Sequence, residues 1–238
     1  MGTGLPNKIF EQIKEEIIRE VYPIGSKLPP ERELAAKYDA SRFAVREAIA
    51  MLAQNGFVET QPQSGSYVRD FIREGNLDTL VQTLRVRRVI DRQTLDSLLK
   101  FRFTTETSAA AEAAVRITDK NIYDLSANLK QKKANLDNIL ILADLDYQFH
   151  FEIIRISENI INKLIFQSFE PIYSFFTEYF YSLPGAAQKS LELNLKLLDT
   201  FRRREADLSA QAMGEILKFA EKKVYEAIDE GDRLIHIR

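Results

Sequence analysis

Two arginines, Arg42 and Arg46, lie one helical turn apart in the segment "DASRFAVREAIAML", residues 39–52. Residues at i and i+4 share one face of a helix, so both guanidinium groups can reach outward together. Ser41, directly before them, is a residue type that caps helix N-termini. An arginine fork fits the O6 and N7 atoms of guanine, and a helix N-terminus favours phosphate. This chemistry is suited to duplex DNA, provided that the surrounding segments form a DNA-binding domain. The alternative is a solvated helix surface on which Arg46 pairs with a nearby carboxylate.

A second group of polar residues lies in the later part of the chain. Asp146 and His150 are four residues apart, a spacing that lets both side chains project from one helix face toward a metal or another ligand. Arg102 and Glu106 have the same spacing and can form an ion pair within one helix. An acid–base pair of Asp146 and His150 is conceivable, but no phosphate-binding glycine loop, nucleophile elbow or cysteine accompanies it. We therefore do not expect an enzyme.

Composition gives weaker guidance than position. The formal net charge is -2, and residues 1–70 carry nine Lys and Arg against ten Asp and Glu, so overall charge does not indicate nucleic acid. The chain has no cysteine, which suits a reducing compartment. It has no apolar run near the roughly 18 residues of a membrane span, and no secretory signal at its start. We expect a cytoplasmic protein with no membrane partner.

The pattern of apolar residues predicts two kinds of structure. Helices are expected over residues 8–21, 30–38 and 41–55, followed by two strands, 57–60 and 66–70, with Gly65 at the turn between them. In the first helix Ile9, Ile13, Ile17 and Val21 should form the buried face. After Asp70 only helices are expected, over residues 76–86, 91–116 (capped by Asp91), 119–133 (capped by Thr118), 138–157, 160–182 (bent at Pro171), 188–203 and 206–230.

The stretch "GSKLPPERELAAKYDASRFAVREAIAMLAQNGFVETQPQSGSYV", residues 25–68, resembles the DNA-binding domain of the GntR family of bacterial transcription regulators. The resemblance implies a winged helix-turn-helix, whose third helix enters the major groove. It also implies a wing, containing Gly65, that lies near the minor groove. The residues that the resemblance implies in contacts with bases or phosphates are Arg32, Ser41, Arg42, Phe43, Arg46 and Gly65. Pro30, Phe43 and Ala44 depart from the usual residues of the family, which leaves the operator sequence open.

Residues 77–230 are similar to the FCD effector domain of the FadR subfamily, through "RFTTE" at 102–106 and "DLDYQFHFEIIRISEN" at 144–159. Many such domains bind a divalent metal through an Asp, a His four residues later and two further His residues. Asp146 and His150 fit the first pair. The two further His positions fall near Asn194 and Ile216, and Glu215 could replace Ile216 as a ligand only if the alignment shifts by one residue. His236, the other histidine, lies in the tail. We therefore expect no cofactor, and Asp146 and His150 are only weak metal candidates.

The same resemblance implies an effector site made by Arg102, Asp146, His150, Tyr173 and Asn194. Arg102 would clamp a carboxylate in two contacts. The segment 160–182 carries eight aromatic residues. It is similar to the tyrosine-rich helix of the acyl-CoA-responsive member of the subfamily, although ordinary core packing explains such residues as well. The effector is thus a carboxylate metabolite, with fatty acyl-CoA as one candidate.

These observations combine into one expectation. The protein is mainly α-helical, with a winged helix-turn-helix domain with a two-stranded wing (1–70), a linker (71–76) and an all-helical effector-binding and dimerisation domain of six or seven helices (77–238). It acts as a homodimeric, ligand-responsive repressor on a short palindromic operator. The alternative is a helical ligand carrier or interaction scaffold that binds no operator.

Overall fold

The computed structural model describes residues 4–87, 89–228 and 234–236. The chain divides into two compact units, residues 1–88 and 89–238. The expected class, mainly α-helical with a small two-stranded wing, is confirmed. Within the described residues no helix is long and apolar enough to cross a membrane. The domain bounds expected from the sequence stay a prediction. They place residues 77–87 in the second domain, whereas in the structure the helix over 77–87 belongs to the first unit and contacts the helix Leu5–Ile18 there.

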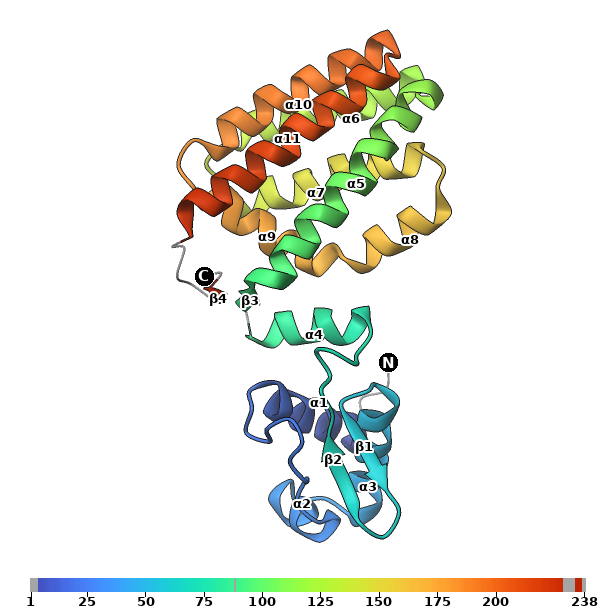
Figure 1. Cartoon of the computed structure of the whole chain (residues 1–238), viewed down its shortest axis with the longest axis vertical. Helices are drawn as coiled ribbons and strands as arrows, with labels where there is room; N and C mark the ends of the chain where they lie inside the picture. The colour runs from blue at the N-terminus through green and yellow to red at the C-terminus, as the bar shows by residue number, and fades with distance from the viewer. Residues whose placement is uncertain (1–3, 88, 229–233, 237–238) are drawn as a thin grey trace. The chain divides into compact units, whose positions relative to one another are not determined.

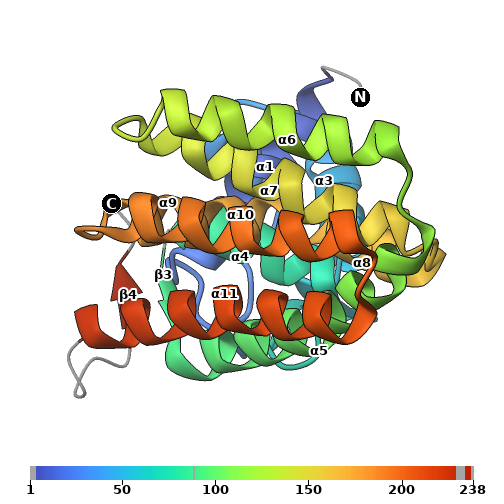
Figure 2. The ribbon, with the colours of Figure 1, turned by 90° about the horizontal axis from the view of Figure 1, so that it is seen from above.

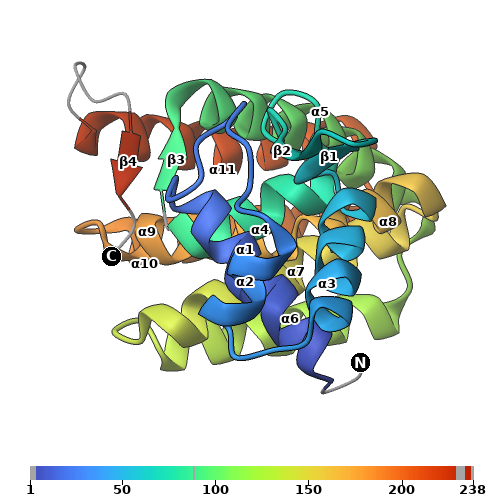
Figure 3. The same ribbon diagram turned by 90° about the horizontal axis from the view of Figure 1, so that it is seen from below.

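The first unit consists of three helices, a hairpin and a fourth helix (Figure 1). Their bounds are α1 Leu5–Ile18, α2 Glu31–Lys37, α3 Arg42–Gln54, β1 Val58–Gln61, β2 Gly65–Val68 and α4 Leu77–Arg87. Figure 3 shows α2 beside α3 and the hairpin by one end of α3, where β1 contacts this helix. This is the order of a winged helix-turn-helix.

One apolar core holds the first unit together. Ile9, Ile13 and Ile17 of α1 are buried in it, as expected, together with Val45 and Leu52 of α3. The expectation that Val21 completes the stripe was wrong. Helix α1 ends at Ile18, and the side chain of Val21 is 59% exposed. Glu20, just before it, has a positive φ of 62°, which turns the chain out of the helix.

Helix α3 starts where the sequence predicts. The hydroxyl of Ser41 accepts a hydrogen bond from the backbone N–H of Ala44 at 3.2 Å, so the N-cap is confirmed. Helix α2 begins after Pro30, which supplies no side-chain cap. The cap and the buried stripe together fix which residues of α3 face solvent.

The wing is an antiparallel hairpin in which Val58 pairs with Val68 and Gln61 pairs with Gly65. Gly65 has a φ of +124°, a conformation that L-residues with side chains rarely adopt. A Cβ at this position would lie 2.7 Å from Cε of Lys27. The hairpin turn therefore depends on glycine at its end.

The second unit contains seven helices in its described part, bracketed by two short strands. Their bounds are β3 Val89–Asp91, α5 Arg92–Arg116, α6 Asp119–Ala134, α7 Ile139–Ile156, α8 Ile160–Ser168, α9 Glu170–Ser182, α10 Ala186–Arg203, α11 Ala206–Ala227 and β4 Leu234–His236. Figure 2 shows α6, α7, α10 and α11 as long, roughly aligned helices, and α11 packs along both α5 and α10. Asp91 caps α5 and Thr118 caps α6, as expected from the sequence.

Two local expectations for the second unit were wrong. Residues 160–182 form two helices rather than one bent helix, because Pro171 lies in the first turn of α9 and cannot supply the N–H that would continue α8. Strands were not expected after residue 70, yet β3 pairs antiparallel with β4. Both strands have three residues, too few for a period-two pattern to show in the sequence.

Candidate functional site

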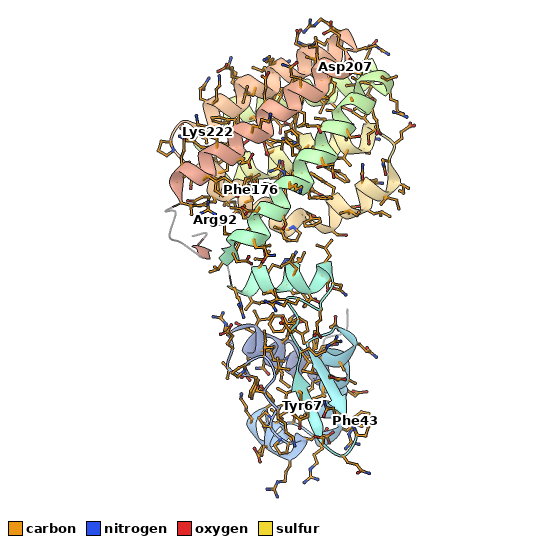
Figure 4. The ribbon with its side chains drawn as sticks, viewed as in Figure 1. Phe43, Tyr67, Arg92, Phe176, Asp207 and Lys222 are labelled. Atoms are coloured by element: carbon orange, nitrogen blue, oxygen red, sulfur yellow. The ribbon has the colours of Figure 1, made fainter. Side chains whose placement is uncertain are left out.

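The exposed start of α3 is the first candidate site. Arg42, Phe43 and Arg46 are all exposed there, and Arg32 is exposed on α2. Figure 4 shows Phe43 at the surface of the first unit, and its ring is 70% exposed. An apolar ring with so much contact to water has no role in the core. The structure thus places all three arginines expected to bind DNA, together with Phe43, on the exposed surface of α2 and α3.

Arg46 is not free in this structure. Its Nε and Nη2 donate hydrogen bonds to the two carboxylate oxygens of Glu31, at 2.9 and 2.7 Å. The hydrogen bond from Arg46 lowers the pKa of Glu31 below its ordinary value. This bidentate pair is the alternative that the sequence left open for Arg46. Its side chains remain exposed, 72% for Arg46 and 34% for Glu31, so water competes with the contact.

The second candidate site is a buried charged cluster of Arg102, Glu106, Lys132, Asp146 and His150 in the second unit, all at most 5% exposed. Nε of Arg102 donates to Glu106 at 2.6 Å, which confirms the expected ion pair. The other carboxylate oxygen of Glu106 contacts Nδ1 of His150. Helix α5 thus supplies both a cation, Arg102, and an anion, Glu106, and the anion contacts the histidine of α7.

Asp146 is the centre of the other half of the cluster. Its Oδ1 accepts hydrogen bonds from Nζ of Lys132 and the hydroxyl of Tyr181, both at 2.6 Å. Its Oδ2 accepts one from the hydroxyl of Tyr173 at 2.8 Å, and that hydroxyl in turn accepts from Arg102 at 3.0 Å. Three helices, α6, α7 and α9, therefore meet at one carboxylate, and α5 is joined to it through Tyr173.

Opposing effects set the ionisation of the cluster. Burial alone would raise the pKa of Asp146, but the charges of Lys132 and His150 outweigh it and hold that pKa well below its usual range. Burial would likewise raise the pKa of Glu106, and Arg102 and His150 lower it overall. Burial lowers the pKa of Lys132, and Asp146 offsets only part of that effect. The side chains of Arg102 and Lys132 thus lie against the carboxylates of Glu106 and Asp146, and His150 contacts both carboxylates.

The sequence analysis missed Lys132 and Tyr181. A signal for Lys132 was present, because it continues the row of Leu125 and Leu129, both buried, along one face of α6. A lysine on the apolar face of a helix needs a buried partner. Which carboxylate supplies it follows only from the packing of α6 against α7.

A small cavity opens beside the cluster, with space for little more than one water molecule. Arg102, Asp146, His150 and Ser190 contribute the polar part of its lining, and Phe176, labelled in Figure 4, contributes to the apolar part. Asn194 lies one helical turn from Ser190 on α10, so the two share a face. Its amide is fully buried, and neither its oxygen nor its nitrogen has a hydrogen-bond partner. An unsatisfied buried amide one turn from a residue that lines the cavity is a place for a polar ligand or water.

The donor set does not fit the divalent metal that the family resemblance implies. Ile216 lines the cavity at one expected ligand position, and Asn194 stands at the other. Glu215 does not replace them, since its carboxylate pairs with Lys196 at the surface. In the described part of the chain no three His, Cys, Asp or Glu residues are grouped to hold a metal. The side chain of His236 lies outside the described residues.

These two sites define a class of protein, a winged helix-turn-helix unit joined to a helical unit with a polar cavity. Residues 5–68 match the bacterial regulatory proteins of the gntR family, and residues 97–219 match the FCD domain. The chain belongs to the GntR family and carries an FCD domain; it is a DNA-binding transcriptional regulator, as the members of this family are.

Individual relatives agree with this assignment. The chain is 28% identical to the Uxu operon regulator of Haemophilus influenzae, over 94% of this chain and 84% of the relative. It is 26% identical, over 90% of this chain and 84% of the relative, to an Escherichia coli protein assigned to regulation of the L-lactate dehydrogenase operon. Among solved structures, that of Lar, which controls the Listeria monocytogenes agr system, has a TM-score of 0.61 at 17% identity. It covers 96% of this chain and 100% of its own, and supports the fold alone.

Proposed function

We propose that the protein is a cytoplasmic homodimeric repressor of the FadR subfamily that binds a short palindromic operator and releases it when a small carboxylate enters the FCD cavity. We do not assign it any catalytic activity. The single observation that carries the proposal is that the same chain has an exposed arginine-bearing helix start and, in its second unit, a small cavity beside a buried charged cluster. The helical carrier without operator binding remains the second candidate.

The DNA-binding part assigns a role to each exposed residue. Arg42 and Arg46 bind guanine edges or phosphates from the first turns of α3, and Arg32 binds phosphate from α2. Phe43 contacts a thymine methyl group, which apolar side chains recognise in the major groove. Gly65 lets the wing approach the minor groove. The hydroxyl of Ser41 already accepts the N-cap hydrogen bond, so its operator contact would be a phosphate that shares the helix N-terminus.

The effector part rests on the chemistry of the cavity lining. Arg102 is the cation for a carboxylate, and Asp146 and His150 contribute to the polar part of the lining. Tyr173 orders Asp146 from behind the lining, and Asn194, one turn from the lining residue Ser190, supplies the amide that lacks a partner. The cavity has space for about one water molecule, so a small carboxylate would displace fewer lining side chains than a fatty acyl chain would. The name of the relative assigned to the L-lactate dehydrogenase operon is consistent with a hydroxy acid. Fatty acyl-CoA would require the aromatic side chains of α9 to move out of the core.

Self-association is supported by the surface of the second unit. Helix α8 exposes three large apolar side chains, Ile160, Ile161 and Leu164, each more than half exposed. A contiguous apolar helix surface of this kind is typical of interaction sites. A two-fold dimer then matches a palindrome, since each protomer reads one half-site.

The proposal is tested with the full chain, DNA from upstream of its own gene, and two sets of candidate effectors: small hydroxy and sugar acids, and medium- and long-chain acyl-CoAs. A small acid should raise the melting temperature and weaken the gel shift; stabilisation by acyl-CoA alone would contradict the effector assignment. Absence of any salt-dependent shift would favour the carrier.

The Asn194→Leu variant separates the cavity from the fold. Replacing an unsatisfied buried amide by an apolar group of similar size should leave the free energy of unfolding unchanged or raise it by about 1 kcal/mol. DNA binding should be retained, and the thermal stabilisation by the small acid should disappear. Retention of the full effector response in this variant would exclude Asn194 from the effector site.

A further inference from the structure

The carboxylate of Asp146 already holds a cation that the chain itself supplies, the ammonium group of Lys132. We propose that this lysine blocks the divalent metal that the family resemblance implies at Asp146, so that this domain is built without a metal. The proposal concerns the resident cation and does not depend on which effector the cavity accepts.

The position of Lys132 is the main observation. Its Nζ lies 2.6 Å from Oδ1 of Asp146, the carboxylate that the family resemblance assigns as first metal ligand, and 3.3 Å from the hydroxyl of Tyr181. The same Nζ lies 5.5 Å from the ring centroid of Phe149. Its side chain is 1% exposed. Burying a lysine this completely is costly unless its ammonium group has partners, and here a carboxylate and an aromatic ring supply them. Lys132 is therefore a structural member of the buried cluster and not a surface residue.

Both carboxylate oxygens of Asp146 already accept hydrogen bonds. Besides the lysine, Oδ1 accepts from Tyr181 and Oδ2 accepts from Tyr173. A metal ion binding at this carboxylate would have to displace hydrogen bonds and lie beside an ammonium of like charge, in a low-dielectric interior where repulsion is strong. The lysine and a divalent ion therefore exclude each other.

The remaining ligand positions agree with this exclusion. Nε2 of His150 lies 3.8 Å from Oδ2 of Asp146, while Nδ1 contacts Glu106. Ile216 has no ligating atom, and the amide of Asn194 is a weak substitute for imidazole. Arg102 and Lys132 already lie against the two carboxylates of the cluster, so a dication at Asp146 would add further buried positive charge beside them.

Metal content of the wild-type full chain is the first test. After incubation with Zn²⁺, Mn²⁺ or Ni²⁺ and gel filtration, elemental analysis should find well under one ion per chain, and neither these ions nor EDTA should shift the melting temperature. One ion per chain, with a melting temperature that falls in EDTA, would overturn the proposal.

The second test rebuilds the missing ligands with and without the lysine. The Asn194→His/Ile216→His double variant keeps Lys132 and should still take up no zinc, whereas adding Lys132→Ala should give one zinc per chain and a melting temperature that rises with zinc. Adding Lys133→Ala instead, an exposed neighbour on the same helix, should behave like the double variant. Zinc uptake by the double variant with Lys132 present contradicts the proposal, and so does a Lys132→Ala variant that zinc neither enters nor stabilises.

Discussion

Arg46 is held by a carboxylate that it must leave before its guanidinium can bind a base. The partner, Glu31, belongs to α2, and the side chain of Arg46 is largely in water while that of Glu31 is about one third exposed, a setting in which ion pairs contribute little to stability. A guanine edge or a phosphate offers the same bidentate geometry. In the proposed function, the Glu31 pair would therefore order Arg46 for the operator while competing with it only weakly.

Removing this competitor should strengthen operator binding. In Glu31→Gln the charge that holds Arg46 is gone, and we expect operator affinity to rise about two- to fivefold, the size typical of an exposed ion pair. The control is Glu33→Gln, which removes one negative charge from the same helix. Fluorescence anisotropy at several salt concentrations measures both variants. Equal gains in the two variants would attribute the effect to net charge and not to release of Arg46.

Among the elements, those set by local rules could be predicted from the sequence. Ser41, Asp91 and Thr118 each cap a helix as expected, because capping depends on residues within one turn. Pro171 marks an irregularity that the sequence locates correctly, but the proline separates α8 from α9 instead of bending a single helix. The pairing of β3 with β4 joins segments far apart in sequence, and so no local pattern indicates it.

The candidate sites likewise differ in how far the sequence alone predicts them. The arginine face of α3 follows from a cap and a period of 3.6 residues, so the sequence places it correctly on the surface. The contacts of Lys132 and Tyr181 with Asp146 depend on how α6, α7 and α9 pack together. The sequence shows the unusual residue but not its partner.

The wing offers a prediction for an element. Gly65→Ala forces a side chain into a conformation with φ of +124° and against Lys27, so we expect the free energy of unfolding to fall by about 1–2 kcal/mol. Because the strain is at the wing, operator affinity should fall as well. Gly56→Ala is the matched control, since Gly56 has a φ of +77° but follows α3 and has no atom within 4 Å of the added Cβ. Thermal melts and gel shifts compare the two. If both variants show the same drop in affinity for the same drop in stability, the wing has no direct part in binding.

For the whole molecule, repression requires that the two units be coupled. A small carboxylate in the second unit can weaken DNA binding by the first only if it binds the DNA-bound and released arrangements with different affinity. The metal-free cluster would then respond to the effector alone, since no second ligand has to be present. DNA recognition by the first unit is nevertheless the property on which regulation depends.

The most direct measurement is therefore the salt-dependent affinity of an Arg32→Ala/Arg42→Ala/Arg46→Ala variant for the DNA upstream of its own gene. All three side chains are exposed, so melting should be unchanged. We expect affinity to fall at least about 100-fold, and the slope of log K against log salt to shrink by about one for each phosphate that the variant no longer binds. A control that removes the same charge from the same unit, Lys8→Ala/Arg19→Ala/Arg73→Ala, should keep most of the affinity. A triple-arginine variant that binds this DNA as tightly as the wild type would contradict the account.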